Sequence, residues 1–313
     1  MSQPDTRPFA LALMGPTASG KTQAALDVAT RWPAHLISVD SALVYRHLDV
    51  GSAKPDAATR ARFPHALIDI CEPWQPYSAA DFARDARVEI DRALAQGKMP
   101  VLVGGTGLYF RALTEGLSDL PESDPQIRTE LDAELAARGL GALHARLQTL
   151  DPKAASKIHP NDPQRTLRAL EVIQLTGQPL STLQGQRRAD LPVRLLKLVL
   201  CPADRGLLHA RIAIRFEQML TDGLIAEVEK LRAMPNVHAD LPALRAVGYR
   251  QTWEALDGSI PMRELCDRGI FATRQLAKRQ ITWLRAEADA YWLDSSQADF
   301  LSELLRRVAL ARD

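Results

Sequence analysis

The hydrophobic pattern changes character along the chain. In the first third, short apolar runs alternate with amphipathic segments: residues 9–15, 35–40, 65–70 and 99–105 have the pattern of buried strands, and residues 21–32 and 78–97 that of helices. Such alternation predicts a parallel sheet with helices on both faces. Ser78 and Asp81 have capping-box spacing, which predicts where the second helix begins.

The pattern is different after Leu117. Residues 121–177 have little β-branched clustering and frequent Pro and Gly, which favours helices and turns. A strand pattern resumes at 193–202, followed by helical runs, a short strand at 290–294 and a last helix. We therefore predict an α/β fold with a discontinuous core, residues 1–118 and 178–313, and a helical insertion domain, residues 119–177.

Residues 15–22, GPTASGKT, fit the pattern G-x-x-x-x-G-K-[ST] between a predicted strand and a predicted helix. In such a P-loop, backbone N–H groups and the helix N-terminus converge on phosphate oxygens, Lys adds charge and Ser or Thr offers a hydroxyl to a metal ion. An ordinary Gly-rich turn would not explain the Lys-Thr pair. The predicted phosphate site comprises Gly15, Pro16, Thr17, Ala18, Ser19, Gly20, Lys21 and Thr22.

The loop by itself does not separate ATP from another diphosphate. ATP is the usual ligand, so a small-molecule kinase is one hypothesis, with Asp40 or Asp69 orienting a metal ion at a strand end. A non-catalytic RNA-binding P-loop protein is another hypothesis. A kinase has no use for the arginine-containing motifs downstream.

Composition narrows the class of protein. The 313 residues include 39 basic and 38 acidic side chains, so any site for a polyanion must be a local patch. The three cysteines are scattered, which indicates neither a disulfide framework nor a zinc site. No apolar run is as long as a membrane span, and the apolar N-terminal stretch continues into the P-loop as a strand would, not as a signal peptide. We expect a cytoplasmic protein that does not enter the membrane.

Four further stretches accompany the P-loop: residues 39–55, 102–113, 158–171, and 244–251 together with 272–285. In this order the five closely resemble the tRNA dimethylallyltransferases, over about residues 15–294. The resemblance implies that the P-loop holds the diphosphate of dimethylallyl diphosphate. It further implies transfer of the prenyl group to N6 of the adenosine 3′-adjacent to the anticodon of tRNA, with release of diphosphate.

The resemblance also assigns catalytic roles. Asp40 matches the Asp of the family's DS motif and would accept the N6 proton; its alternatives are metal orientation or helix capping. Thr106 would lie in the channel near the base and prenyl group, or else cap a helix. The family often has Met where this chain has Gly107. Arg215 matches a diphosphate-binding residue, although with Arg211 one turn earlier it could form a solvated stripe.

Mg²⁺ is expected as cofactor from the diphosphate and Thr22, without a dedicated protein cage. The enzyme is expected to be a monomer that binds the anticodon stem-loop. The resemblance assigns tRNA contacts to Asp40, Ser41, Ala42, Leu43, Thr106, Arg128, Gln164, Arg165, Thr166, Leu167, Arg168, Arg245, Ala246, Val247, Gly248, Tyr249 and Arg250.

Of these residues, Tyr249 could stack on a base and the arginines could meet phosphates, although a single Arg is more often an ordinary surface residue. Helical spacing also places Arg274, Lys278 and Arg285 on one face, which we predict to track tRNA phosphates. The alternative for that face is solvated surface.

Overall fold

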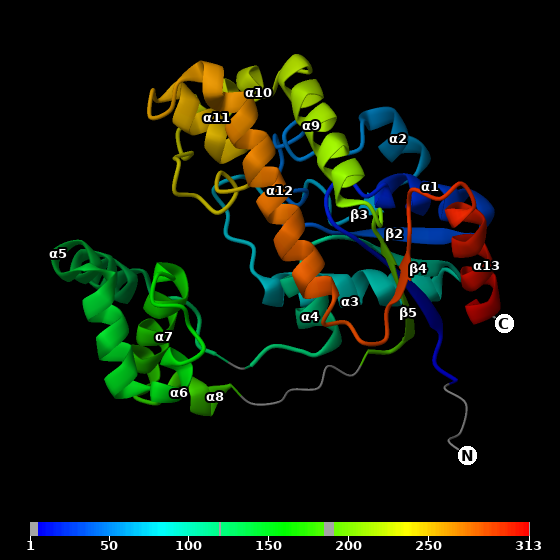
Figure 1. Cartoon of the computed structure of the whole chain (residues 1–313). Coiled ribbons are helices and arrows are strands. Elements are labelled where there is room, and N and C mark those ends of the chain that lie inside the picture. The colour runs from blue at the N-terminus through cyan, green and yellow to red at the C-terminus, as the bar shows by residue number, and fades with distance from the viewer. Residues whose placement is uncertain (1–5, 119, 185–190, 313) are drawn as a thin grey trace. The chain divides into compact units, whose positions relative to one another are not determined.

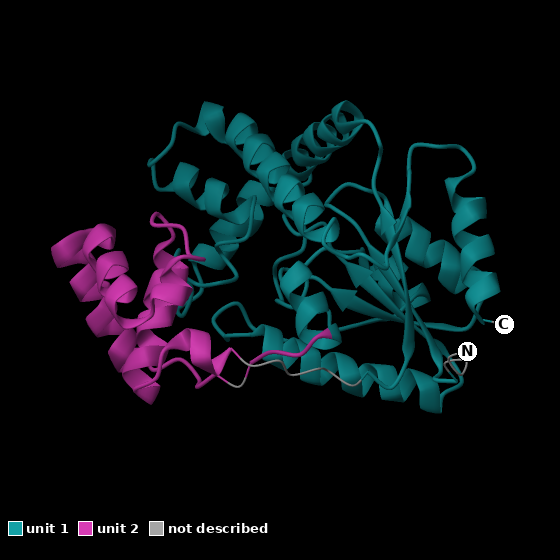
Figure 2. Ribbon diagram, turned by 60° about the horizontal axis from the view of Figure 1, so that its bottom comes forward, with its two compact units in different colours: residues 1–114, 190–313 teal, residues 115–189 magenta. Residues whose placement is uncertain are grey.

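The computed structural model describes residues 6–118, 120–184 and 191–312. The chain divides into two compact units, coloured separately in Figure 2. Unit 1 takes in residues 1–114 and 190–313, and unit 2 takes in residues 115–189.

Unit 1 is built on a parallel sheet in which the described strands have the order β3-β2-β4-β1-β5-β6; β2, β3, β4 and β5 are labelled in Figure 1. This confirms the predicted fold class. The order puts β1 in the interior, between β4 and β5, where both of its edges are hydrogen-bonded. The strands are β1 (Phe9–Met14), β2 (Ala34–Val39), β3 (His65–Ala66), β4 (Met99–Gly104), β5 (Arg194–Leu200) and β6 (Tyr291–Leu293).

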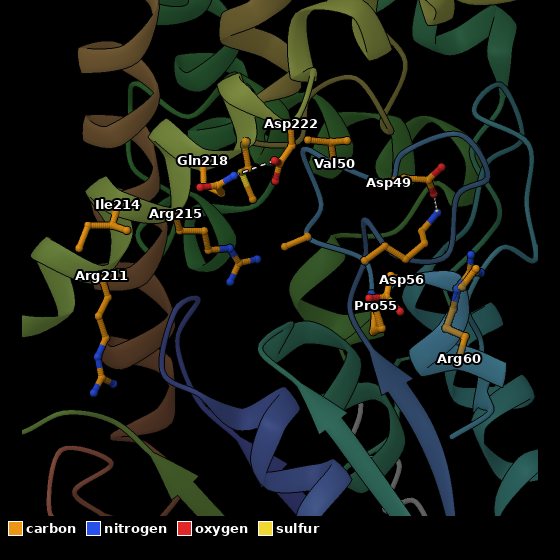
Figure 3. Close-up of a pocket in the computed structure, with 14 residues that line it drawn as sticks. Asp49, Val50, Pro55, Asp56, Arg60, Arg211, Ile214, Arg215, Gln218 and Asp222 are labelled. Carbon is orange, nitrogen blue, oxygen red and sulfur yellow. Dashed lines mark hydrogen bonds and ion pairs between the residues drawn. The ribbon is translucent and has the colours of Figure 1, made fainter. Parts of the chain in front are cut away.

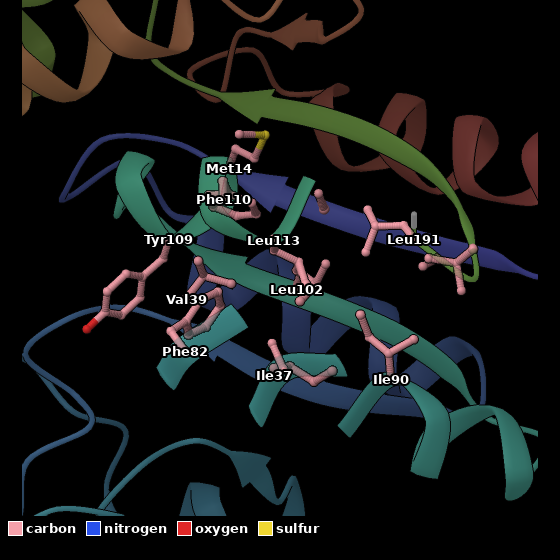
Figure 4. Close-up of a cluster of buried hydrophobic side chains, with 14 of the residues drawn as sticks. Met14, Ile37, Val39, Phe82, Ile90, Leu102, Tyr109, Phe110, Leu113 and Leu191 are labelled. Atoms are coloured by element: carbon pink, nitrogen blue, oxygen red, sulfur yellow. The ribbon is translucent and has the colours of Figure 1, made fainter. Parts of the chain in front are cut away.

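Each face of the sheet is covered by helices. One face packs on α3 (Ala79–Ala95) and α4 (Gly107–Thr114), where Phe82, Ile90 and Phe110 join the strand side chains shown in Figure 4. The other face packs on α1 (Lys21–Arg31) and α13 (Phe300–Arg312). Burial on both faces explains why these strands are continuous apolar runs without a polar alternation.

A second apolar cluster in unit 1 joins helices from the C-terminal half to residues 44–48. This cluster packs helices from residues 205–284 against residues 44–48, and Ala18 of the P-loop lies against it. The helices are α9 (Arg205–Thr221), α10 (Leu224–Arg232), α11 (Tyr249–Leu256) and α12 (Leu265–Leu284), with the 3₁₀ helix η1 (Met262–Glu264) leading into the last.

The strand predicted at residues 65–70 is largely wrong. Only His65 and Ala66 pair with β2, because Leu67 and Asp69 have left-handed backbone angles, φ 63° and 57°, which end the strand. Asp69 is then held in ion pairs with Lys54 and Arg60. Its carboxylate therefore fixes the loop that precedes α2 (Ala57–Arg62), a structural role and not the metal-orienting one considered above.

Unit 2 is helical, with an apolar core of Leu, Ala and Val side chains from its helices α5 (Pro125–Leu150), α6 (Pro152–Ala155), α7 (Pro163–Thr176) and α8 (Leu180–Leu183). The predicted boundary after residue 177 is too early. Leu180 is buried in this core, and the buried Asp151 carboxylate accepts hydrogen bonds from Ser181 N at 2.7 Å and Ser181 Oγ at 2.7 Å. Asp119, where the predicted insertion begins, lies outside the described residues. None of the described helices is long and apolar enough to cross a membrane.

Candidate active site

The carboxyl ends of three strands meet at one edge of the sheet. Met14 is in register with Gly104, and Gly104 with Val39. The segments that follow these residues are the P-loop, residues 105–106 and Asp40. Crevices at this edge are where open α/β sheets bind ligands, so topology alone brings together segments far apart in the sequence.

Hydrogen bonds fix the segments after β2 and β4 to each other. The Ser41 N–H donates to Thr106 Oγ1 at 3.1 Å, and the Thr106 N–H donates to Val39 O at 3.2 Å. The Asp40 carboxylate accepts from the Ala42 N–H at 2.9 Å. Thr106 therefore uses its hydroxyl to hold the Asp40–Ser41 segment, while its carbonyl begins α4 by accepting from the Tyr109 N–H.

The P-loop presents a partly buried lysine. Lys21 Nζ donates to Pro16 O at 3.1 Å across the loop. Burial lowers the pKa of Lys21 to about 8, although the neighbouring Asp40 carboxylate raises it, and the Arg215 guanidinium lowers it further. Thr22, on the first turn of α1, is exposed. Lys21, Asp40 and Arg215 thus act on one another electrostatically, which places three of the predicted residues in one site.

Arg215 reaches this site from α9. Burial lowers the pKa of its guanidinium, and the Asp40 carboxylate opposes that shift. Figure 3 shows Arg215 extending into a cavity of about 670 Å³, whose opposite wall is formed by residues 49–57. Arg211, one turn earlier, also lines this cavity and, like Arg215, is partly buried. Lys21 and Arg215 thus place two cations near the Asp40 carboxylate, the kind of charge that a diphosphate binds.

Comparison with known proteins identifies the family of this chain. The family model described as IPP transferase matches residues 43–287. The chain belongs to the IPP transferase family. It is 60% identical over 299 residues to the tRNA dimethylallyltransferase of Stenotrophomonas maltophilia strain R551-3, covering 93% of each protein.

Two solved structures also resemble it. The full-length tRNA isopentenylpyrophosphate transferase of Bacillus halodurans aligns with a TM-score of 0.70 and 37% identity, covering 98% of this chain and 97% of that one. A eukaryotic dimethylallyltransferase acting on tRNA aligns with a TM-score of 0.80 and 25% identity, covering 98% and 79%. The matched family model begins at residue 43, after the P-loop and Asp40, whereas each of these two structures covers 98% of this chain.

The motif QRTLR of this IPP transferase lies on the first turns of α7 in unit 2, and only part of it is available to a ligand. Gln164 and Arg165 are exposed, whereas Thr166 and Leu167 are buried. Arg168 donates to Glu171 Oε2 at 2.8 Å and to Pro121 O at 2.6 Å. The buried side chains of Thr166 and Leu167 are therefore not available to a ligand on the surface of this unit, and Arg168 is held by its own unit. Arg128 on α5 is half-buried, 3.7 Å from Asp132.

The prediction that Tyr249 stacks on a base is also wrong. Its side chain is fully buried, and its hydroxyl donates to Glu227 Oε1 at 2.5 Å while accepting from the Ser52 N–H at 3.1 Å. Gly248 is buried too, whereas Arg245 and Arg250 on either side are exposed, and Ala246 and Val247 are half-buried. This motif supports the loop at residues 49–52 through Tyr249, and its most exposed residues are Arg245 and Arg250.

Of the three basic residues predicted to share one exposed face of α12, two are exposed. Arg274 is half-buried, and one of its terminal nitrogens faces His209 O on α9 at 3.5 Å. Lys278 and Arg285 are exposed, as predicted for a surface that meets phosphates. Arg274 therefore lies partly in the packing between α9 and α12, and its Nε has no hydrogen-bond partner among the described residues.

Three residues of the site were not predicted from the sequence. Glu227 accepts hydrogen bonds from the N–H groups of Asp49, Val50 and Gly51. Gln280 on α12 contacts the P-loop and the segment after β4. The Trp283 indole fills the place of a side chain at 107, because a Cβ atom on Gly107 would lie 2.3 Å from Trp283 Cδ2. Where the family often has Met, this chain therefore has Gly107 with the Trp283 indole of α12 packed against it.

Proposed function

We propose that this protein transfers the dimethylallyl group from dimethylallyl diphosphate to N6 of the adenosine 3′-adjacent to the anticodon of tRNA, and releases diphosphate. One observation supports this above others: a carboxylate, Asp40, lies in the same site as two cations, Lys21 and Arg215, in a chain of the IPP transferase family. Prenyl transfer to an amine needs both charges, a base for the nucleophile and cations for the leaving group.

In the proposed reaction, N6 attacks C1 of the prenyl group, the C1–O bond to the diphosphate breaks, and the N6 proton passes to the Asp40 carboxylate. Lys21, Arg215 and the P-loop N–H groups stabilise the negative charge that accumulates on the diphosphate. Thr106 holds the Asp40–Ser41 segment in place through the Ser41 N–H. The protein's contribution is thus placement of a base at one end of the reacting bond and cations at the other.

Mg²⁺ fits this site as a partner of the diphosphate. Among the described residues no group of three or more His, Cys, Asp or Glu side chains could hold a metal ion, whereas Thr22 offers an exposed hydroxyl on the first turn of α1. Mg²⁺ commonly takes one or two protein oxygens and completes its shell with phosphates and water. Thr22 would hold the ion, and the ion would neutralise diphosphate charge.

The substrate side of the proposal is the anticodon stem-loop, whose single-stranded bases can turn into a pocket without breaking a duplex. The exposed arginines and Lys278 described above are the groups that would meet its phosphates. We expect the enzyme to act as a monomer in the cytoplasm.

The test uses purified protein, Mg²⁺, radiolabelled dimethylallyl diphosphate and an unmodified tRNA transcript with adenosine after the anticodon. We expect label in the RNA, recovered as N6-prenyladenosine after digestion. The matched control is the same transcript with guanosine at that position, which should stay unlabelled. A protein that leaves both transcripts unlabelled, or that transfers phosphate from ATP to a small acceptor, would contradict the proposal.

A further inference from the structure

The side chain of Gln280 lies between the two halves of the site. Its Oε1 accepts from the Thr17 N–H at 2.9 Å, and its Nε2 donates to Gly105 O at 3.0 Å. Thr17 belongs to the P-loop, and Gly105 precedes Thr106. One neutral amide therefore joins the segment assigned to the diphosphate to the segment that holds Asp40.

The fit around this amide is close. A Cβ atom on Gly105 would lie 2.5 Å from Gln280 Nε2 and 2.8 Å from Gly15 O, so no larger residue fits at 105 while the amide is in place. The amide is thus packed against the backbone of both segments. A shift of either segment would break one of its two hydrogen bonds.

The contacts form a continuous path from one end of the reacting bond to the other. Gln280 contacts Thr17 and Gly105, and the next residue, Thr106, accepts from the Ser41 N–H beside Asp40. The sheet sets the coarse spacing of the diphosphate site and the base, and this amide adds a direct link between the two segments beyond the strand ends. A misplacement of about 1 Å at a reacting centre can cost on the order of 10²-fold in rate.

The helix that carries Gln280 does not depend on these two bonds. Leu265, Ile270, Ala277 and Leu284 of α12 are buried in apolar clusters of unit 1. Removing the amide should therefore leave α12 in place. The effect of a substitution should be confined to the spacing of the two loops.

We propose that Gln280 is a positioning residue for prenyl transfer, whose amide fixes the spacing between the P-loop and the Gly105–Thr106 segment. This inference rests on the function proposed above. Both halves of the amide are required, since the Thr17 N–H needs an acceptor and the Gly105 carbonyl needs a donor. Gln280 acts through these loops and not by touching the reacting atoms.

The first test is Gln280→Met, which keeps the length of the side chain and removes both hydrogen bonds. We expect the single-turnover rate at saturating substrates to fall by about 10- to 100-fold, with tRNA affinity within about twofold of wild type. Thr282→Ala is the control on the same helix, because that hydroxyl is exposed and bonds only to Lys278 O within α12. A rate within about twofold of wild type for Gln280→Met would overturn the proposal.

The second test is Gln280→Glu, followed by the pH dependence of its rate divided by the wild-type rate. An ionised Glu accepts from Thr17 but repels the Gly105 carbonyl, whereas a protonated Glu supplies both an acceptor and a donor. An unperturbed Glu has a pKa of about 4.3, so the carboxylate is ionised between about pH 6 and about pH 8. In that range we expect the ratio to stay about tenfold or more below one, and to recover only as the pH falls toward that pKa; Gln280→Met should show no such recovery. A rate for Gln280→Glu within about twofold of wild type at about pH 7 to 8 would overturn the positioning role. Failure of the wild type to prenylate tRNA would instead overturn the proposed function.

Discussion

Two motifs of unit 1, the P-loop (residues 15–22) and residues 245–250, were both predicted to bind substrate, and the structure treats them in opposite ways. In the P-loop, Lys21 has a hydrogen bond to its own loop, Thr22 is exposed, and the buried Ser19 hydroxyl has no hydrogen-bond partner among the described residues. In residues 245–250, Tyr249 is buried and its hydroxyl is fully engaged.

The difference shows how to separate a binding motif from a supporting one. A polar group that is satisfied inside the protein is unavailable to a ligand, whereas a buried group without a partner costs free energy unless a ligand completes it. Glu227 illustrates the first case, since its carboxylate receives three backbone N–H groups and the Tyr249 hydroxyl. Buried groups without a hydrogen-bond partner among the described residues include the Ser19 hydroxyl of the P-loop, Thr166 Oγ1 and Arg274 Nε, whereas Tyr249 is engaged and supports residues 49–52 beside the cavity.

The largest effect should come from Asp40→Asn. The amide keeps the size of the carboxylate but cannot accept a proton, and general-base catalysis contributes about 10²–10⁴-fold. We expect kcat to fall by about that factor with little change in KM, measured as single-turnover prenyl transfer at saturating tRNA. Transfer within about twofold of wild type would show that Asp40 is not the base.

Lys21→Ala should weaken binding of dimethylallyl diphosphate and leave tRNA binding nearly unchanged. The variant loses charge-assisted hydrogen bonds to the diphosphate, worth about 1.5–3 kcal/mol each, so the Kd for dimethylallyl diphosphate should rise by roughly 10- to 100-fold. The Kd for tRNA should stay within about twofold. Separate titrations with each substrate check this. An unchanged Kd for dimethylallyl diphosphate together with weakened tRNA binding would show that the P-loop does not bind the leaving group.

Tyr249→Phe should affect stability and not RNA binding. The substitution leaves the Ser52 N–H without its acceptor and takes one donor from Glu227. We expect the free energy of unfolding to fall by about 1–3 kcal/mol, measured by urea denaturation. Tyr291→Phe is the control, since that ring is half exposed. A tenfold loss of tRNA affinity with unchanged stability would restore Tyr249 as an RNA contact.

The lowered pKa of Lys21 predicts how donor binding depends on pH. Below about pH 8 the amine is already charged in the free protein, so affinity for the diphosphate should be constant. Above that pH a proton must be taken up on binding, and affinity should fall by up to about tenfold per pH unit. Lys21→Arg stays charged and should show no such decline. A wild-type affinity that is constant up to about pH 10 would contradict the assignment.

The smallest effect concerns the RNA surface. Lys278→Gln should weaken tRNA binding a few-fold and reduce the log–log salt slope by about one, because one phosphate contact releases about one counterion. Arg274→Gln should leave the slope nearly unchanged, since that guanidinium faces His209 O. Titrations at several salt concentrations compare the two. Equal slopes for Lys278→Gln and wild type would show that this part of α12 is solvated surface.

The sequence by itself determined the parallel sheet, the P-loop between β1 and α1, and the start of α3. The Ser78 hydroxyl accepts from the Asp81 N–H at 3.1 Å, and Asp81 in turn accepts from the Ser78 N–H at 3.0 Å, as the capping-box spacing predicts. These features depend on residues within a few positions of one another, so periodicity and turn chemistry are sufficient to predict them.

The tertiary structure decided which motif residues remain available and which side chains join the motifs. Gln280 meets Thr17 across 263 positions and Gly105 across 175, and Tyr249 meets Ser52 across 197. No local pattern encodes such pairs, because they depend on where the crossovers of the sheet place α11 and α12. The same reason explains the short β3: the run at 65–70 has the composition of a strand, but ion pairs from Lys54 and Arg60 to Asp69 hold its second half in a left-handed turn.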